Sequence, residues 1–102
     1  MHITKNESGH TLSIAGALEI GAAEELRNAL RDFLDRTLNP TLDLSQLESV
    51  DAATLQVFCS ARKTAERSGK QLVLAAVSPA VRRKTEALGL SIAELGASVD
   101  GI

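Results

Sequence analysis

Strand-like and helix-like patterns alternate along the whole of this chain. A hairpin pattern comes first, and a helix, a strand, a helix, a strand, a helix and a last strand follow it. An open β-sheet layered with helices has this order, whereas a helical bundle or a β-sandwich does not, so we expect an α/β fold. With 102 residues the chain is too short to bury two separate cores, and we expect one domain over residues 1–102.

The hairpin pattern lies at the N-terminus. Ile3 marks one short strand, and Leu12 and Ile14, which alternate with polar residues, mark the next. Residues 7–10 contain the serine and glycine of a turn between them. We expect residues 16–21 to form a connection that leads into the first helix.

Two helices and one strand fill the middle of the chain. Apolar side chains recur at helical spacing over residues 22–37 and again over residues 52–68. Asn39-Pro40 cannot continue the first of these helices. We expect residues 41–44 to form a strand and residues 45–50 a loop.

The last third of the chain repeats the pattern. Residues 72–76 form a short apolar run, which is typical of a central strand covered on both faces. Ser78-Pro79 predicts a capped helix start, and Gly89 predicts its end. Ile92 and Leu95 suggest a last strand at the edge of the sheet.

Composition and charge exclude several classes of protein. Hydrophobic residues make up 44% of the chain and charged residues 24%, as in folded globular proteins. A formal net charge of -2 and only two aromatic residues argue against a nucleic-acid partner. The lone Cys59 excludes a disulfide framework, and its place in a helical pattern indicates a small core residue. With no signal-peptide pattern and no apolar run of membrane-spanning length, we expect a cytoplasmic protein without membrane insertion.

Five segments between residues 42 and 90 form a specific pattern. They are Leu-Asp-Leu-Ser at 42–45, Val-Asp-Ala-Ala-Thr-Leu at 50–55, Gly-Lys-Gln-Leu-Val-Leu at 69–74, Ser-Pro-Ala-Val at 78–81 and Gly-Leu at 89–90. Their order and spacing resemble the STAS family, to which bacterial anti-sigma factor antagonists belong. The resemblance implies a mixed sheet of four to five strands layered with about three to four helices.

The resemblance also implies a partner-binding site at the start of the second helix. In STAS domains of this kind, the serine after the motif aspartate is phosphorylated by a partner kinase, and the phosphate dissociates the pair. Here Ala52 follows Asp51, and alanine cannot accept a phosphoryl group. Thr54 could receive a phosphate, but we favour a structural role for it. The partner-binding residues implied are Asp51, Ala52, Ala53, Thr54, Leu55 and Gln56.

No set of residues predicts catalysis. Asp51 could act with Asp43 or Glu48 as a carboxylate pair, but no nucleophile, metal or base converges on it. An N-cap role for Asp51 is the better interpretation. His2 and His10 lack further ligands at metal-binding spacing, and we expect them at the surface. We therefore expect a non-enzymatic protein with no catalytic residue, metal or cofactor.

The resemblance leaves two kinds of protein partner open. One is a kinase-like anti-sigma factor or a chemotaxis or histidine-kinase component, the latter because Leu-Gln-Val at 55–57 resembles variant STAS proteins found with such systems. The other is the ATPase of a bacterial phospholipid ABC transporter, since single STAS domains of this size occur as cytoplasmic subunits there. The first is the leading hypothesis, and it makes the chain a signal-transduction module.

Overall fold

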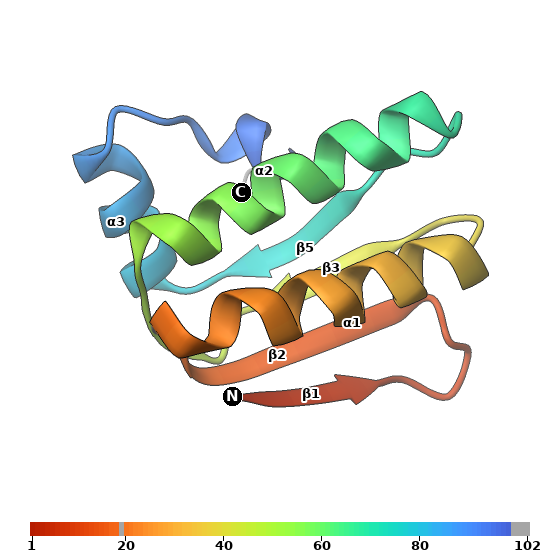
Figure 1. The fold of residues 1–102 in the computed structure, drawn as a ribbon, viewed down its shortest axis with the longest axis horizontal. Helices are drawn as coiled ribbons and strands as arrows, with labels where there is room; N and C mark the ends of the chain where they lie inside the picture. Colours follow the sequence, from red (N-terminus) through yellow and green to blue (C-terminus); the bar gives the residue numbers. More distant parts are fainter. Residues whose placement is uncertain (19, 99–102) are drawn as a thin grey trace.

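The computed structural model describes residues 1–18 and 20–98. Its α-helices are α1 (Ala23–Arg36), α2 (Ala52–Arg67) and α3 (Pro79–Ala87), with short 3-10 turns η1 (Ile20–Ala22) and η2 (Ile92–Glu94). Its strands are β1 (His2–Lys5), β2 (Thr11–Leu18), β3 (Thr41–Leu44), β4 (Leu47–Val50), β5 (Val73–Val77) and β6 (Ala97–Ser98). The expected α/β fold is confirmed, and Figure 1 shows how these elements are arranged.

The strands form one mixed sheet. The order is β1-β2-β3-β5-β6, and β4 pairs with β2 beside this path. β1 runs antiparallel to β2, with Ile3 opposite Ile14, so the expected hairpin is confirmed. The pairs β2–β3, β3–β5 and β5–β6 are parallel. Each parallel step requires a crossover connection, which α1 and α2 provide for the central strands.

Helices α1 and α2 lie side by side over one face of the sheet (Figure 1). Helix α3 packs against β4. Alternate residues of the central strands point at the two long helices and are fully buried, as Ile14, Leu42 and Leu74 are. They meet Phe33 of α1 and Phe58 of α2, which are also buried. This single layer between sheet and helices is the hydrophobic core.

Capping residues and glycines end the helices where the sequence predicted. Ser78 caps α3 with a hydrogen bond from the Val81 N–H to its Oγ at 3.2 Å, and Pro79 opens the helix. Gly69 and Gly89 follow α2 and α3 with φ of 74° and 75°, in the left-handed region that glycine reaches without strain. The bounds of the two long helices differ from the predicted bounds by no more than one residue at either end.

Three predictions about the strands were wrong. Residues 45–50 are not all loop, because β4 occupies Leu47–Val50. β2 runs on through Gly16 to Leu18, where a connection was predicted, and its second half pairs with β4 beyond the end of the shorter β3. At the C-terminal side, Ile92 lies in η2 and Leu95 follows it, and the edge strand is β6.

The prediction that residues 72–76 are covered on both faces was also wrong. β5 lies between β3 and β6, but Ala75 is exposed and Val73 is only half-buried. Both long helices lie on the other face of the sheet, so the side chains that point away from them reach solvent. Within the described residues, no helix has the length and apolar character needed to cross a membrane.

Candidate partner-binding site

A capping box fixes the first turn of α2. The Asp51 carboxylate oxygen Oδ1 accepts a hydrogen bond from the Thr54 backbone N–H at 2.8 Å. In return, Thr54 Oγ1 accepts from the Asp51 backbone N–H at 3.1 Å. The Thr54 hydroxyl can donate to the Asp51 carbonyl oxygen at 2.9 Å or to Oδ1 at 3.0 Å. The N-cap role predicted for Asp51 is confirmed, and it places a carboxylate at the positive end of the helix dipole.

Residues 51–56 divide into a buried half and an exposed half. Thr54 and Leu55 are both fully buried, and Asp51 is half-buried. Ala52, Ala53 and Gln56 are exposed on the first turns of α2. These three side chains lie fully at the surface, while the Asp51 cap, Thr54 and Leu55 hold the helix start in place.

The end of β3 holds a second carboxylate close by in sequence. Asp43 Oδ1 accepts hydrogen bonds from the Ser45 backbone N–H at 3.0 Å and from the Ser45 hydroxyl at 2.6 Å. This arrangement is an Asx turn that leads the chain from β3 into β4. Asp43 and Asp51 are thus each hydrogen-bonded within their own turn, as structural carboxylates are.

A shallow depression flanks the start of α2 and was not expected from the sequence. It lies between β4 and α3, and β4 leads directly into Asp51. Its lining residues are Glu48, Ser49, Val50, Ala80, Arg83, Lys84 and Ala87. The unexpected strand β4 brings Glu48 and Ser49 beside the basic residues Arg83 and Lys84 of α3. The exposed surface around Ala52 is therefore wider than the motif itself.

The cysteine and the two histidines belong to the core and the surface respectively. Cys59 is 7% exposed, and burial raises the pKa of its thiol, with the Glu94 carboxylate adding to the effect. A neutral buried thiol is a packing group and not a nucleophile. His2 and His10 are exposed, as expected. Over residues 1–18 and 20–98, no three histidine, cysteine or acidic side chains come together as metal ligands would.

Solved structures with the same fold cover almost the whole chain. An anti-sigma factor antagonist of Mycobacterium paratuberculosis is 17% identical, with a TM-score of 0.74 over 99% of this chain and 85% of that one. A protein of Thermotoga maritima described as an anti-sigma factor antagonist is 21% identical, with a TM-score of 0.71 over 99% and 86% of the two chains. A variant of the RsbS protein of Moorella thermoacetica is 21% identical, with a TM-score of 0.66 over 99% and 86%. At these identities the likeness shows the fold.

Sequence comparison identifies the family. A search of curated proteins found no significant match. A family model described as "Mlab, STAS domain" matches residues 1–96, which is nearly all of the chain. The resemblance drawn from the segments between residues 42 and 90 is confirmed, and the chain belongs to the STAS domain family.

Proposed function

We propose that this STAS domain is a non-enzymatic protein-binding module of bacterial signal transduction that docks a partner through the first turns of α2. One observation carries the proposal: Ala52, Ala53 and Gln56 are exposed on a helix start whose backbone is fixed by the capping box. A surface that is already ordered loses little entropy when a partner binds. The two alanine methyl groups offer a flat apolar contact, and Gln56 offers one amide group for hydrogen bonding.

The proposed site carries no phosphorylation switch of its own. Ala52 stands where the family resemblance implies a serine, and it has no hydroxyl group. Thr54 is 0% exposed and its hydroxyl is hydrogen-bonded to Asp51, so a kinase would have to open the first turn of α2 to reach it. In this proposal the domain stays in its binding-competent form, and any regulation acts on the partner.

The proposed partner is a kinase-like anti-sigma factor or a chemotaxis or histidine-kinase component. Similar structures described as anti-sigma factor antagonists support this class. The alternative partner is the ATPase of a phospholipid ABC transporter. Both partners would be cytoplasmic proteins, and they differ in what accompanies them, because the ATPase would bring a membrane permease with it.

Affinity capture of the tagged protein from its native cells tests the proposal. The Ala52→Glu variant introduces a bulky charge into the site, and a glutamate in the first helical turn suits the helix dipole, so the fold should tolerate it. Ala93→Glu is the matched control, because Ala93 is also an exposed alanine and lies in η2, away from the start of α2.

We expect a soluble kinase or chemotaxis component to be captured by the unchanged protein and by Ala93→Glu, and to be lost with Ala52→Glu. Capture of an ATPase together with a permease would contradict the proposed partner and support the alternative function in lipid transport. A partner that binds Ala52→Glu as well as the unchanged protein would show that docking uses another surface.

A further inference from the structure

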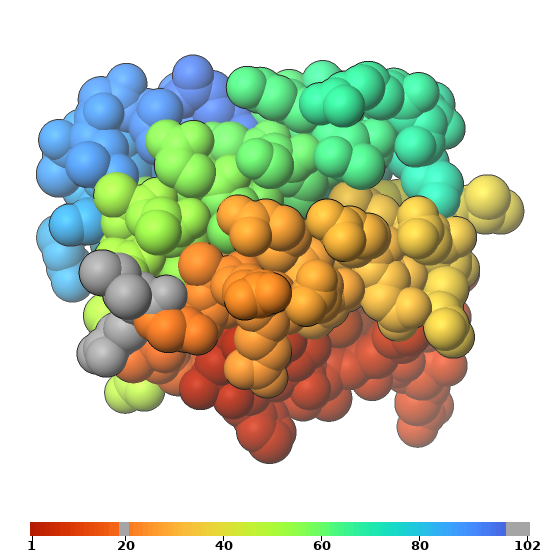
Figure 2. All heavy atoms as spheres, in the orientation of Figure 1, coloured from red at the N-terminus to blue at the C-terminus, as the bar shows by residue number. Residues whose placement is uncertain are grey.

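A groove separates α1 from α2 on the face of the molecule turned away from the sheet. We call it the α1–α2 groove, and its volume is about 230 Å³. The two helices lie next to each other on the face that Figure 2 shows, α1 in orange to yellow and α2 in green to teal. The groove is lined by Arg27, Leu30, Arg31, Leu34, Val57, Ser60, Ala61 and Thr64.

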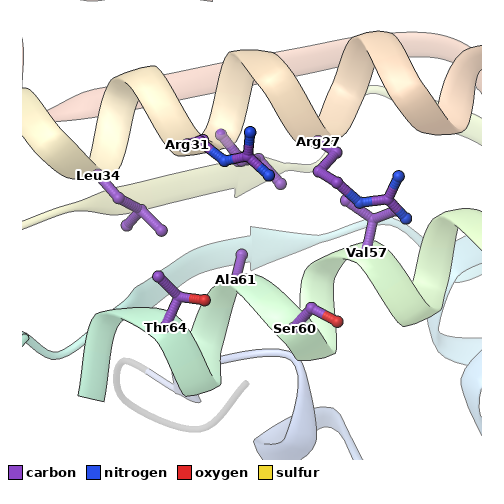
Figure 3. Close-up of a pocket in the computed structure, with 8 residues that line it drawn as sticks. Arg27, Arg31, Leu34, Val57, Ser60, Ala61 and Thr64 are labelled. Carbon is purple, nitrogen blue, oxygen red and sulfur yellow. The ribbon is translucent and has the colours of Figure 1, made fainter. Parts of the chain in front are cut away.

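The floor of the groove is apolar and its two walls are polar. Leu30, Leu34, Val57 and Ala61 are all less than 10% exposed and form the floor. Figure 3 shows the arginine side chains on the α1 wall and the hydroxyl-bearing side chains on α2. Arg27 and Arg31 are four residues apart on α1, and Ser60 and Thr64 are four residues apart on α2. The two residues of each pair therefore lie on the same side of their helix, one turn apart. The floor suits an apolar group, and the walls offer hydrogen-bond donors at two positions along each helix.

Neither arginine of the groove forms an ion pair within the part of the chain that the structure describes. Elsewhere on the two helices, Arg36 pairs with Asp32 at 2.9 Å and Arg62 with Glu66 at 2.8 Å. Among residues 1–18 and 20–98, no carboxylate lies within ion-pair distance of Arg27 or Arg31. Two positive charges and two hydroxyl groups therefore face one small volume in a chain whose net charge is negative.

We propose that the α1–α2 groove binds a small organic phosphomonoester. Its phosphate carries a charge close to -2 at neutral pH and has three strong acceptor oxygens, which match the two guanidinium groups and the two hydroxyl groups. Its apolar body would lie on the leucine, valine and alanine floor. The volume is below that of a typical drug-sized pocket, so the groove suits a single ring or short chain and not a nucleotide. This inference does not depend on the proposed docking of a protein at Ala52.

NMR titration of the isotope-labelled full chain tests the proposal, with phenyl phosphate as the probe. A ligand of this size should bind with a dissociation constant of about 1–10 mM, so the titration must reach roughly 20 mM. Phenol, inorganic phosphate and benzoate are the comparison probes, because they lack the phosphate, the apolar body and the second negative charge respectively. Arg27→Gln and Arg31→Gln remove one guanidinium each from exposed positions, where the fold should tolerate the change. Arg36→Gln is the matched control, since it removes the same charge from the same helix outside the groove.

We expect phenyl phosphate to shift the signals of residues 27–34 and 57–64 saturably, and each groove arginine variant to weaken its binding about tenfold. Arg36→Gln should bind as the unchanged protein does, and phenol should produce no saturable shift. The proposal is overturned if phenyl phosphate causes no saturable shift at these residues, or if the groove variants bind it unchanged. It is also overturned if benzoate or inorganic phosphate binds as tightly as phenyl phosphate, because the groove would then not select both parts of the ligand.

Discussion

Loss of the capping box at the start of α2 should destabilise the domain by a measurable amount. Asp51→Ala removes the carboxylate that accepts hydrogen bonds from the Thr54 N–H at 2.8 Å and from its hydroxyl at 3.0 Å. Replacing an aspartate N-cap by alanine costs about 1 kcal/mol, within a range of about 0.5–2 kcal/mol. Thr54→Val keeps the shape of the side chain but removes Oγ1, the acceptor for the Asp51 N–H. Because that oxygen is fully buried, water cannot take its place, and we expect a cost of about 1–2 kcal/mol.

The two substitutions should not be additive. The two side chains also share a hydrogen bond, from the Thr54 hydroxyl to Asp51 Oδ1 at 3.0 Å, which either substitution removes, so the double variant should lose less than the sum of the two single variants. We expect an interaction energy of about 0.5–1 kcal/mol from this double-mutant cycle. A domain of this size is usually stable by about 5–15 kcal/mol, so all three variants should still fold.

Urea unfolding followed by far-UV circular dichroism is the assay. The chain has no tryptophan and no tyrosine, so intrinsic fluorescence would report little. Thr64→Val is the control, because it makes the same substitution on the same helix at an exposed position, where it should change the free energy of unfolding by no more than about 0.5 kcal/mol. If Thr54→Val costs no more than Thr64→Val, the Thr54 side of the capping box does not stabilise the start of α2. An interaction energy of zero would mean that the two side chains act independently.

Three further predictions concern the C-terminal segment and the core. Arg62→Met removes the 2.8 Å hydrogen bond from Nε to the Glu94 carbonyl oxygen, and amide hydrogen exchange around Glu94 should become about fivefold faster, with no change as the opposing result. Gly96→Ala places a Cβ 3.0 Å from the Leu72 carbonyl oxygen, so urea unfolding should show a loss of about 1–3 kcal/mol, and an unchanged midpoint would mean that the backbone yields freely. Because burial raises the pKa of the Cys59 thiol, the unfolded chain ionises first, and stability present below the unfolded-state pKa should be lost as pH rises above it. The free energy of unfolding should therefore fall more steeply between about pH 8 and about pH 10 in the unchanged protein than in Cys59→Ala, and equal slopes would contradict this.

The helices could be predicted from the sequence because their ends depend on local chemistry. Asp51 and Ser78 accept hydrogen bonds from the first turns of α2 and α3, and Gly69 and Gly89 take the left-handed conformation after the last turns. Each of these roles involves only residues a few positions apart. The pattern of side chains is therefore enough to reveal them.

The strand β4 could not be predicted in the same way. Its two buried residues, Leu47 and Val50, are three positions apart and do not show the alternation of a strand. The strand exists because β2 is eight residues long and β3 only four, so the second half of β2 is free to pair with the chain that follows β3. That pairing depends on the register of distant segments, which local periodicity does not show.

The same distinction applies to the two sites. The motif around Asp51 lies on one continuous stretch of chain, so the sequence could indicate it. Its division into buried and exposed side chains, and its neighbours on β4 and α3, required the fold. The α1–α2 groove combines two helices that are about 30 residues apart in sequence, as Arg27 and Val57 are, and no local pattern joins them.

The burial pattern of the motif separates the residues that determine the fold from those that a partner would contact. Asp51, Thr54 and Leu55 are hydrogen-bonded or buried, so a change at any of them alters the helix start itself. Ala52 and Ala53 are exposed, and neither side chain takes part in the capping box, so a substitution at either position leaves the capping box intact. A substitution at these two positions should therefore change the surface that the proposed partner would contact and not whether the domain folds. Substitutions at Ala52 can thus test binding, whereas substitutions at Thr54 test stability first.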